Sequence, residues 1–201
     1  MKGTDILIIL AKNPVYGKVK TRLAAAIGAA AALDIYRQLL RHTLDVAAKV
    51  PADKVIFYSD GPAPDEGAAP GFARATQYGA DLGARMENAF THVFRQGYEK
   101  AVMIGTDCPA MGERTLAAAF DALHQHDVVI GPAYDGGYYL LGMKQAHHTL
   151  FENMPWSTAA VFEETVTVCR DSGLRYLLLP TLHDVDEKKD LSQLAKMNQH
   201  G

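Results

Sequence analysis

Four basic residues and a glycine follow the first apolar run of the chain, residues 6–10. The apolar run predicts a buried strand, and a loop at the carboxyl end of such a strand is where ligands of open α/β sheets bind. Gly17 permits a turn in which backbone N–H groups approach an anion. Clustered cations favour phosphate, so we predict a phosphate-binding loop, with a solvated basic loop as the alternative. The loop residues expected at the phosphate are Ala11, Lys12, Gly17, Lys18, Lys20 and Arg22.

Two acidic motifs predict a site for a divalent cation. Asp107 follows the apolar residues 101–104, so its carboxylate is expected at the same edge of the sheet. Mg²⁺ typically takes one or two protein carboxylates together with phosphate oxygens and water. Asp184 and Asp186 alternate along an extended segment, and two carboxylates on one side repel unless a cation lies between them. The alternatives are that Asp107 caps the next helix and that the second motif is a charged helix start.

Residues 77–86 lead from a loop into a helix and offer groups that suit a nucleotide. Gln77 can read a base edge through its side-chain amide, and Gly79 permits close approach of the backbone. Arg85 can reach a phosphate. The alternative is that Arg85 simply pairs with Asp81 four residues earlier on the helix.

Two aromatic motifs are candidates for a second part of the pocket. Residues 131–140 combine tyrosines with an Asp-Gly-Gly sequence, which is also an ordinary hairpin turn. Residues 154–158 contain the only tryptophan, which either anchors the core or walls a substrate pocket. The residues predicted to shape a substrate pocket are Asp135, Gly136, Gly137, Tyr138, Trp156, Ser157 and Thr158.

The apolar periodicity predicts an α/β fold with a mostly parallel sheet covered by helices on both faces. Expected strands are residues 6–10, 54–59, 101–105, 128–130, 138–142 and 174–179. Expected helices are residues 28–50, 83–96, 113–125, and a segment capped by Ser157 or Thr158 that runs to about residue 170. Residues 60–71, rich in Gly, Pro and Ala, predict a mobile loop.

The chain is expected to form one domain over residues 1–201. With 201 residues, 48% of them hydrophobic, it can bury a sizeable core, and chains usually divide into domains only at greater length. A net charge of −3 disfavours nucleic-acid polymers and anionic membranes as partners, since both require a broad positive field. Apolar stretches are too short to span a membrane and no small-residue cleavage site follows the first strand, so we expect a cytoplasmic protein. Cys108 and Cys169 are expected to be reduced thiols.

Six motifs, in this order, resemble a bacterial glycosyltransferase family found near radical-SAM and selenium-related genes. The motifs are AKNPVYGKVKTRL, QYGADLGARM, MIGTDCPAM, GPAYDGGYYLLG, MPWST and DVDEKKDL. That family is a branch of the nucleotide-diphospho-sugar transferase superfamily and is similar to phospholactate and molybdenum-cofactor guanylyltransferases. The resemblance spans residues 6–191.

The resemblance implies a GT-A type, Rossmann-like α/β/α sandwich. It implies that Lys18, Lys20 and Arg22 bind phosphates and that Gln77 and Gly79 lie near the base. It also implies that Asp107 and Asp186 hold a metal. The family usually continues the last motif as Asp-Thr-Pro-Glu-Asp, whereas residues 187–189 intervene here.

We therefore predict an Mg²⁺- or Mn²⁺-dependent transferase with Lys20, Arg22 and Asp107 as catalytic residues, because a metal and a basic loop stabilise a phosphate leaving group. Glycosyl transfer from a nucleotide-diphospho-sugar to a small-molecule acceptor comes first, following the resemblance. Nucleotidyl transfer from an NTP, with release of pyrophosphate, comes second because the loop carries more charge than a diphosphate requires. A non-catalytic nucleotide-binding module comes third, and the presence of both Asp107 and Asp186 disfavours it.

Overall fold

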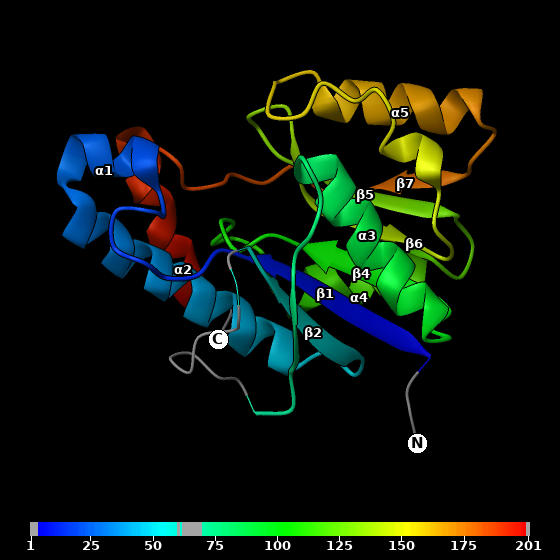
Figure 1. Ribbon diagram of the computed structural model, residues 1–201, viewed down its shortest axis with the longest axis horizontal. Helices are drawn as coiled ribbons and strands as arrows, with labels where there is room; N and C mark the ends of the chain where they lie inside the picture. Colours follow the sequence, from blue (N-terminus) through cyan, green and yellow to red (C-terminus); the bar gives the residue numbers. More distant parts are fainter. Residues whose placement is uncertain (1–3, 60, 62–69, 200–201) are drawn as a thin grey trace.

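Seven strands form one mixed sheet in the computed structural model of the protein, which describes residues 4–59, 61 and 70–199 (Figure 1). The strand order is β3-β2-β1-β4-β6-β5-β7. The strands are β1 (Asp5–Ala11), β2 (Asp53–Tyr58), β3 (Ala73–Thr76), β4 (Lys100–Ile104), β5 (Val128–Pro132), β6 (Tyr138–Met143) and β7 (Tyr176–Leu178).

Helices cover both faces of this sheet and complete a three-layer α/β/α arrangement. They are α1 (Thr21–Ile27), α2 (Ala29–Ala48), α3 (Leu82–Arg95), α4 (Glu113–Ala122) and α5 (Val161–Asp171), with 3₁₀ segments η1 (His148–Leu150) and η2 (Lys188–Gln199). Core residues of α2 and α4 pack on one face, and those of α3 and α5 pack on the other. Figure 1 shows η2, at the red end of the colour bar, beside α1. The predicted fold class is thereby confirmed.

Strand β1 reads as a continuous apolar run because both of its faces are buried. Leu7 and Ile9 join the core under α2, whereas Ile6 and Ile8 join the core under α3. Burying such a side chain contributes about 1.5–3 kcal/mol, so this run fixes the strand at the centre of the sheet. β1 pairs in parallel with β2 on one side and with β4 on the other.

Strand β6 departs from the parallel arrangement of the other strands. This strand runs antiparallel to both of its neighbours, β4 and β5, and follows β5 through a tight turn. The Ala133 N–H donates to Gly137 O at 3.0 Å, and Gly136 has a φ of 88° in the left-handed region. The hairpin alternative for the Asp-Gly-Gly motif is therefore confirmed, although most strand pairs remain parallel.

Three further elements differ from the sequence expectations. Helix α1 and strand β3 were not expected, since α1 begins inside the predicted basic loop and β3 has mostly exposed residues. Helix α5 begins at Val161 rather than at Ser157 or Thr158, because Ser157 has a left-handed φ of 64°. The other predicted elements agree with the structure to within about three residues. Residues 60 and 62–69 of the predicted mobile loop lie outside the described residues.

No helix within the described part of the chain is both long and apolar enough to cross a membrane.

Asp127, just before β5, binds the start of the edge strand β7. Its carboxylate accepts hydrogen bonds from Arg175 N, Nε and Nη2 at 3.1, 3.2 and 3.1 Å. Lys144 Nζ lies 3.1 Å from Oδ1 of the same carboxylate. The hydrogen bonds from Arg175 hold the pKa of Asp127 well below its usual range.

We expect Asp127→Asn to lower the free energy of unfolding by about 1–2 kcal/mol at pH 7, a typical value for hydrogen bonds to a charged group near the surface. A carboxyl whose pKa is lowered by folding stabilises above its unfolded pKa, about 3.9, and loses that effect as the pH falls. Urea unfolding from pH 7 down to about pH 2.5 should therefore show the two proteins converging. A pH-independent difference contradicts this assignment, and Asp121→Asn, at an exposed position of α4, is the matched control.

Candidate functional site

A cavity of about 710 Å³ opens where the carboxyl ends of β1 and β4 meet the beginning of β6. Leu10 and Ala11 come from β1, and Met103 and Ile104 come from β4. Because β6 is antiparallel, its first residue Tyr138 reaches the same edge. The first turn of α3, the loop before α5 and the segment before η2 complete the wall.

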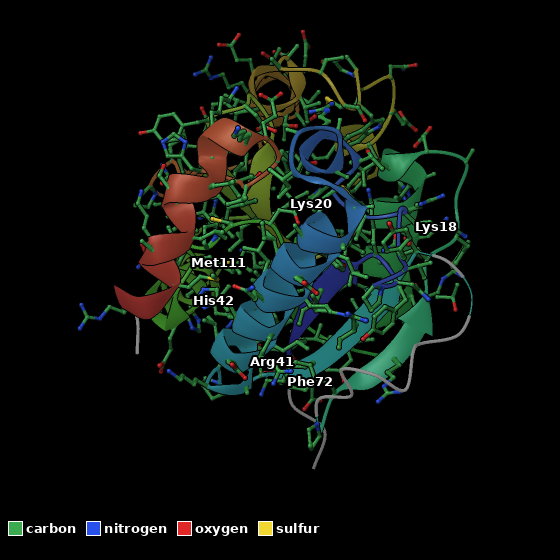
Figure 2. All side chains as sticks on the ribbon, turned by 90° about the vertical axis from the view of Figure 1, so that its left-hand side faces the viewer. Lys18, Lys20, Arg41, His42, Phe72 and Met111 are labelled. Atoms are coloured by element: carbon green, nitrogen blue, oxygen red, sulfur yellow. The ribbon has the colours of Figure 1, made fainter. Side chains whose placement is uncertain are left out.

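An ion-pair triad lies in this cavity. Lys20 Nζ lies 2.7 Å from Asp107 Oδ1 and 3.0 Å from Asp186 Oδ1. The Lys20 side chain is only 3% exposed, whereas the two carboxylate side chains are 40% and 39% exposed. Figure 2 shows Lys20 apart from Lys18, which is exposed and does not line the cavity. The Lys20 side chain is thus almost fully covered, whereas the two carboxylates are partly exposed, and all three residues line the cavity.

The backbone before α1 directs Lys20 to this position. Lys20 has a φ of 47° and a ψ of 46°, a left-handed conformation that costs a side-chain-bearing residue about 1–2 kcal/mol. Val19 and Leu23 are buried on either side of it, and Lys20 O accepts the first hydrogen bond of the helix from Ala24 N at 2.8 Å. Burial alone would lower the pKa of Lys20, but Asp107 and Asp186 together raise it above its ordinary value.

Asp184 lies beside the triad with a different environment. It lines the cavity, but its Oδ1 is buried and has no hydrogen-bond partner in the part of the chain that the structure describes. Burial, followed by repulsion from Asp107, Asp135 and Asp186, raises the pKa of Asp184 to about 8. Among the described residues, no group of three or more His, Cys, Asp and Glu side chains is arranged to hold a metal. The predicted set of three carboxylate ligands is therefore not gathered around one point.

Two carboxylates nevertheless fit a divalent cation that takes its remaining ligands from a substrate. Asp107 and Asp186 both contact the Lys20 ammonium, and both carboxylate side chains are partly open to the cavity. Carboxylate oxygens are the ligands that Mg²⁺ and Mn²⁺ prefer. The alternative role of Asp107 as a cap is wrong, because Gly112 is the N-cap of α4. Asp190 binds the Asp186 and Glu187 N–H groups at 3.1 and 2.8 Å, so the second motif also begins η2.

The predicted phosphate loop divides into residues that reach the cavity and residues that do not. Ala11, Lys12 and Arg22 line it, whereas Gly17 and Lys18 do not. The Lys12 backbone is not free to bind an anion, since its N–H and C=O both hydrogen-bond to the Tyr36 hydroxyl, at 2.8 and 2.7 Å. Apart from Lys20, which is paired with Asp107 and Asp186, the cations of this loop that line the cavity are the side chains of Lys12 and Arg22.

Tyr36 is a site residue that sequence reasoning missed. It lies on α2, is 2% exposed, and reaches the cavity wall. Burial, followed by repulsion from Asp107, raises the pKa of its hydroxyl well above the usual range, so the group stays a neutral donor and acceptor. In the sequence Tyr36 is one of several large residues at helical spacing and carries no further signal.

The segment from β3 to α3 contributes Gln77 and Arg85 to the cavity. Gln77 Nε2 donates to Ala11 O at 3.1 Å and to Phe57 O at 2.8 Å. Both partners are carbonyl oxygens, so the amide orientation is settled and Oε1 is the atom left to accept a bond from a ligand. Gly79 and Asp81 do not line the cavity, because Asp81 caps α3 through Ala84 N at 2.8 Å.

The aromatic motifs form the opposite wall. Asp135, Gly137 and Tyr138 from the hairpin line the cavity together with Trp156, Ser157 and Thr158. Gly136 serves the turn instead, where a Cβ would overlap the Ala159 backbone. A Cβ on Gly83, in the first turn of α3, would overlap the Trp156 indole. Gly83 therefore sets the position of Trp156, a contact that the sequence does not reveal.

Cys108 lies beside Asp107 and lines the cavity, but its environment disfavours the thiolate form. Its side chain is buried, and burial raises the pKa of its thiol to about 12. Cys169 is also buried, and both thiols are free, as expected from the sequence.

Solved structures share this fold over almost the whole chain. A protein from Desulfovibrio desulfuricans G20, described as a "putative nucleotide-diphospho-sugar transferase", is 31% identical, with a TM-score of 0.88 over 99% of this chain and 95% of that chain. CMP:2-keto-3-deoxy-manno-octonic acid synthetase, complexed with CTP, is 11% identical, with a TM-score of 0.62 over 98% and 99%. Rv0371c from Mycobacterium tuberculosis H37Rv, in complex with manganese, is 16% identical, with a TM-score of 0.58 over 94% and 97%.

The second and third of these likenesses concern the fold alone. No curated protein sequence matches the chain. Residues 43–158 match the family described as uncharacterized protein conserved in bacteria, DUF2064, and this match covers more than half of the chain. Together with the 31% identity to the Desulfovibrio protein, this shows that the chain belongs to the DUF2064 family.

Proposed function

We propose that this protein is a divalent-metal-dependent transferase that acts on a nucleotide substrate. The observation that carries the proposal is the content of one cavity. Asp107 and Asp186, which both pair with Lys20, line it together with the cationic side chains of Lys12, Arg22 and Arg85. Cations suit the phosphates of a nucleotide, and paired carboxylates suit the metal that accompanies them. The transferase description of the Desulfovibrio relative and the manganese complex of Rv0371c support it.

The residues of the cavity suggest a division of roles. Lys12, Arg22 and Arg85 bind phosphate oxygens, while Tyr36 fixes the Lys12 backbone. Gln77 Oε1 accepts a hydrogen bond from an N–H of the base. A divalent cation held by Asp107 and Asp186 would neutralise charge that develops on the phosphate leaving group. Trp156 and the hairpin residue Asp135 wall the part of the cavity that receives the sugar or the acceptor.

Glycosyl transfer from a nucleotide-diphospho-sugar to a small-molecule acceptor is the reaction that we place first. The description of the Desulfovibrio relative supports it. So does the aromatic part of the cavity wall, where Tyr138 and Trp156 offer rings against which a sugar can pack. Nucleotidyl transfer is the second candidate, because three cations line the cavity beside the triad and a synthetase of the same fold forms a complex with CTP.

We expect Asp107→Asn to abolish the metal-dependent part of nucleotide binding and to leave the fold intact, because the carboxylate is 40% exposed. The measurement is a thermal-shift screen of nucleoside diphosphates, triphosphates and nucleotide-sugars with and without Mn²⁺, since a ligand of the native state raises the unfolding midpoint. Asp45→Asn, at an exposed position of α2, is the matched control. Equal Mn²⁺-dependent shifts in the wild type and in Asp107→Asn would remove Asp107 from the site.

The two transfer reactions predict opposite orders of affinity. For glycosyl transfer, the nucleotide-sugar should bind as tightly as the matching NTP or more tightly, because the aromatic end of the cavity holds the sugar. For nucleotidyl transfer, the NTP should bind at least about tenfold more tightly, a difference of about 1.4 kcal/mol. Calorimetric titration with Mg²⁺ measures both. Release of pyrophosphate from an NTP and a phosphorylated acceptor, with no sugar donor present, decides for nucleotidyl transfer.

We expect Gly83→Ala to weaken the binding of a nucleotide-sugar without changing the binding of the matching nucleoside diphosphate. The added methyl group displaces the Trp156 indole, so the nucleotide-sugar should bind at least about tenfold more weakly. The matching nucleoside diphosphate, which does not reach Trp156, should bind as it does to the wild type. Trp156→Phe, which keeps an aromatic ring, serves as the comparison in the same titrations. Equal loss for the diphosphate and the nucleotide-sugar contradicts the assignment of Trp156 to the sugar or acceptor.

A further inference from the structure

The ammonium of Lys20 holds a place that a metal ion would have to share. It lies 2.7 and 3.0 Å from the two carboxylates that best fit a divalent cation, and its side chain is 3% exposed. An ammonium so close already neutralises part of their charge. A divalent cation bound to the same oxygens would also be repelled by the ammonium, and burial strengthens that repulsion.

The same surroundings offer the ammonium a second position. Lys20, Lys12 and Arg22 belong to one continuous segment and line one cavity, so a phosphate group bound among these cations gives Lys20 another anion to contact. A lysine side chain is a point charge on a flexible stem and can move without its helix. Asp107 and Asp186 come from other segments, and hydrogen bonds of their own backbones hold them: Val185 N donates to Asp107 O at 2.9 Å, and Asp186 N donates to Asp190.

We propose that Lys20 is an internal counter-cation: it holds Asp107 and Asp186 together in the free protein and leaves them for the substrate phosphates, so that a divalent cation binds strongly only together with a phosphate-bearing ligand. Lys20 is then a positioning residue for the metal. The inference rests on the proposed function, since it assumes that this cavity receives both a metal and phosphates. By thermodynamic linkage, phosphate and metal raise each other's affinity by the same factor.

Binding of Mn²⁺ alone, followed through the electron paramagnetic resonance signal of the free ion, tests the inference without any turnover. We expect Lys20→Met and Lys20→Gln to bind Mn²⁺ at least about tenfold more tightly than the wild type, because the competing charge is gone. Lys18→Met, an exposed residue of the same loop, should bind as the wild type does. The double variant Lys20→Met with Asp107→Asn should lose the gain, which places the ion at this carboxylate pair.

Inorganic phosphate supplies the second arm of the test. It should raise the Mn²⁺ affinity of the wild type and leave that of Lys20→Gln nearly unchanged. Equal or weaker binding of Mn²⁺ by both folded Lys20 variants overturns the inference, because Lys20 would then be only a phosphate ligand or a structural residue. If Lys20→Met unfolds, Lys20→Gln, which keeps a hydrogen-bond donor, decides alone. Failure of the proposed function has a separate signature: no nucleotide shifts the unfolding midpoint of the wild type with Mn²⁺.

Discussion

A buried ammonium must be paired, and this constraint organises the whole site. Leaving the Lys20 charge alone in the interior would cost several kcal/mol, so the chain has to bring anions to it. Asp107 comes from the end of the central strand β4, and Asp186 comes from the tail before η2. Val185, fully buried between the two acidic residues of the tail, donates its N–H to Asp107 O. The last segment of the chain is thereby fastened to the centre of the sheet and closes one side of the cavity.

Side chains rather than ligands satisfy the backbone at the strand ends. The Tyr36 hydroxyl hydrogen-bonds to both the backbone N–H and the backbone C=O of Lys12, and Gln77 Nε2 donates to the carbonyl oxygens of Ala11 and Phe57. Buried polar groups are almost always paired, so these contacts fix the wall before any substrate arrives. The cavity therefore presents side-chain cations, carboxylates and one amide oxygen on a wall whose backbone groups are already hydrogen-bonded.

The sequence was sufficient to predict the elements that are buried on both faces. It was insufficient to predict an exposed edge strand and the contacts between residues far apart in the chain. After their charged first residues, strands β1, β2 and β4 are apolar runs because both faces of the sheet are covered, and they were predicted to within one or two residues. The edge strand β3 is mostly exposed and shows no such signal. Asp107 was expected at the sheet edge because it follows a strand. Lys20 and Asp186 are 166 positions apart, and no local sequence pattern predicts an ion pair between residues at that separation.

The position of the triad in the topology explains why this edge of the sheet forms the cavity. From β1 the chain passes to β2 on one side, whereas β4 lies on the other side, so connections leave β1 and β4 in opposite directions. Ligands of open α/β sheets bind in the crevice at such a switch point. Lys20 follows β1, Asp107 follows β4, and the ion pair spans the two. The cationic and the aromatic residues of the cavity therefore line one crevice, in which the ion pair joins the segments that follow β1 and β4.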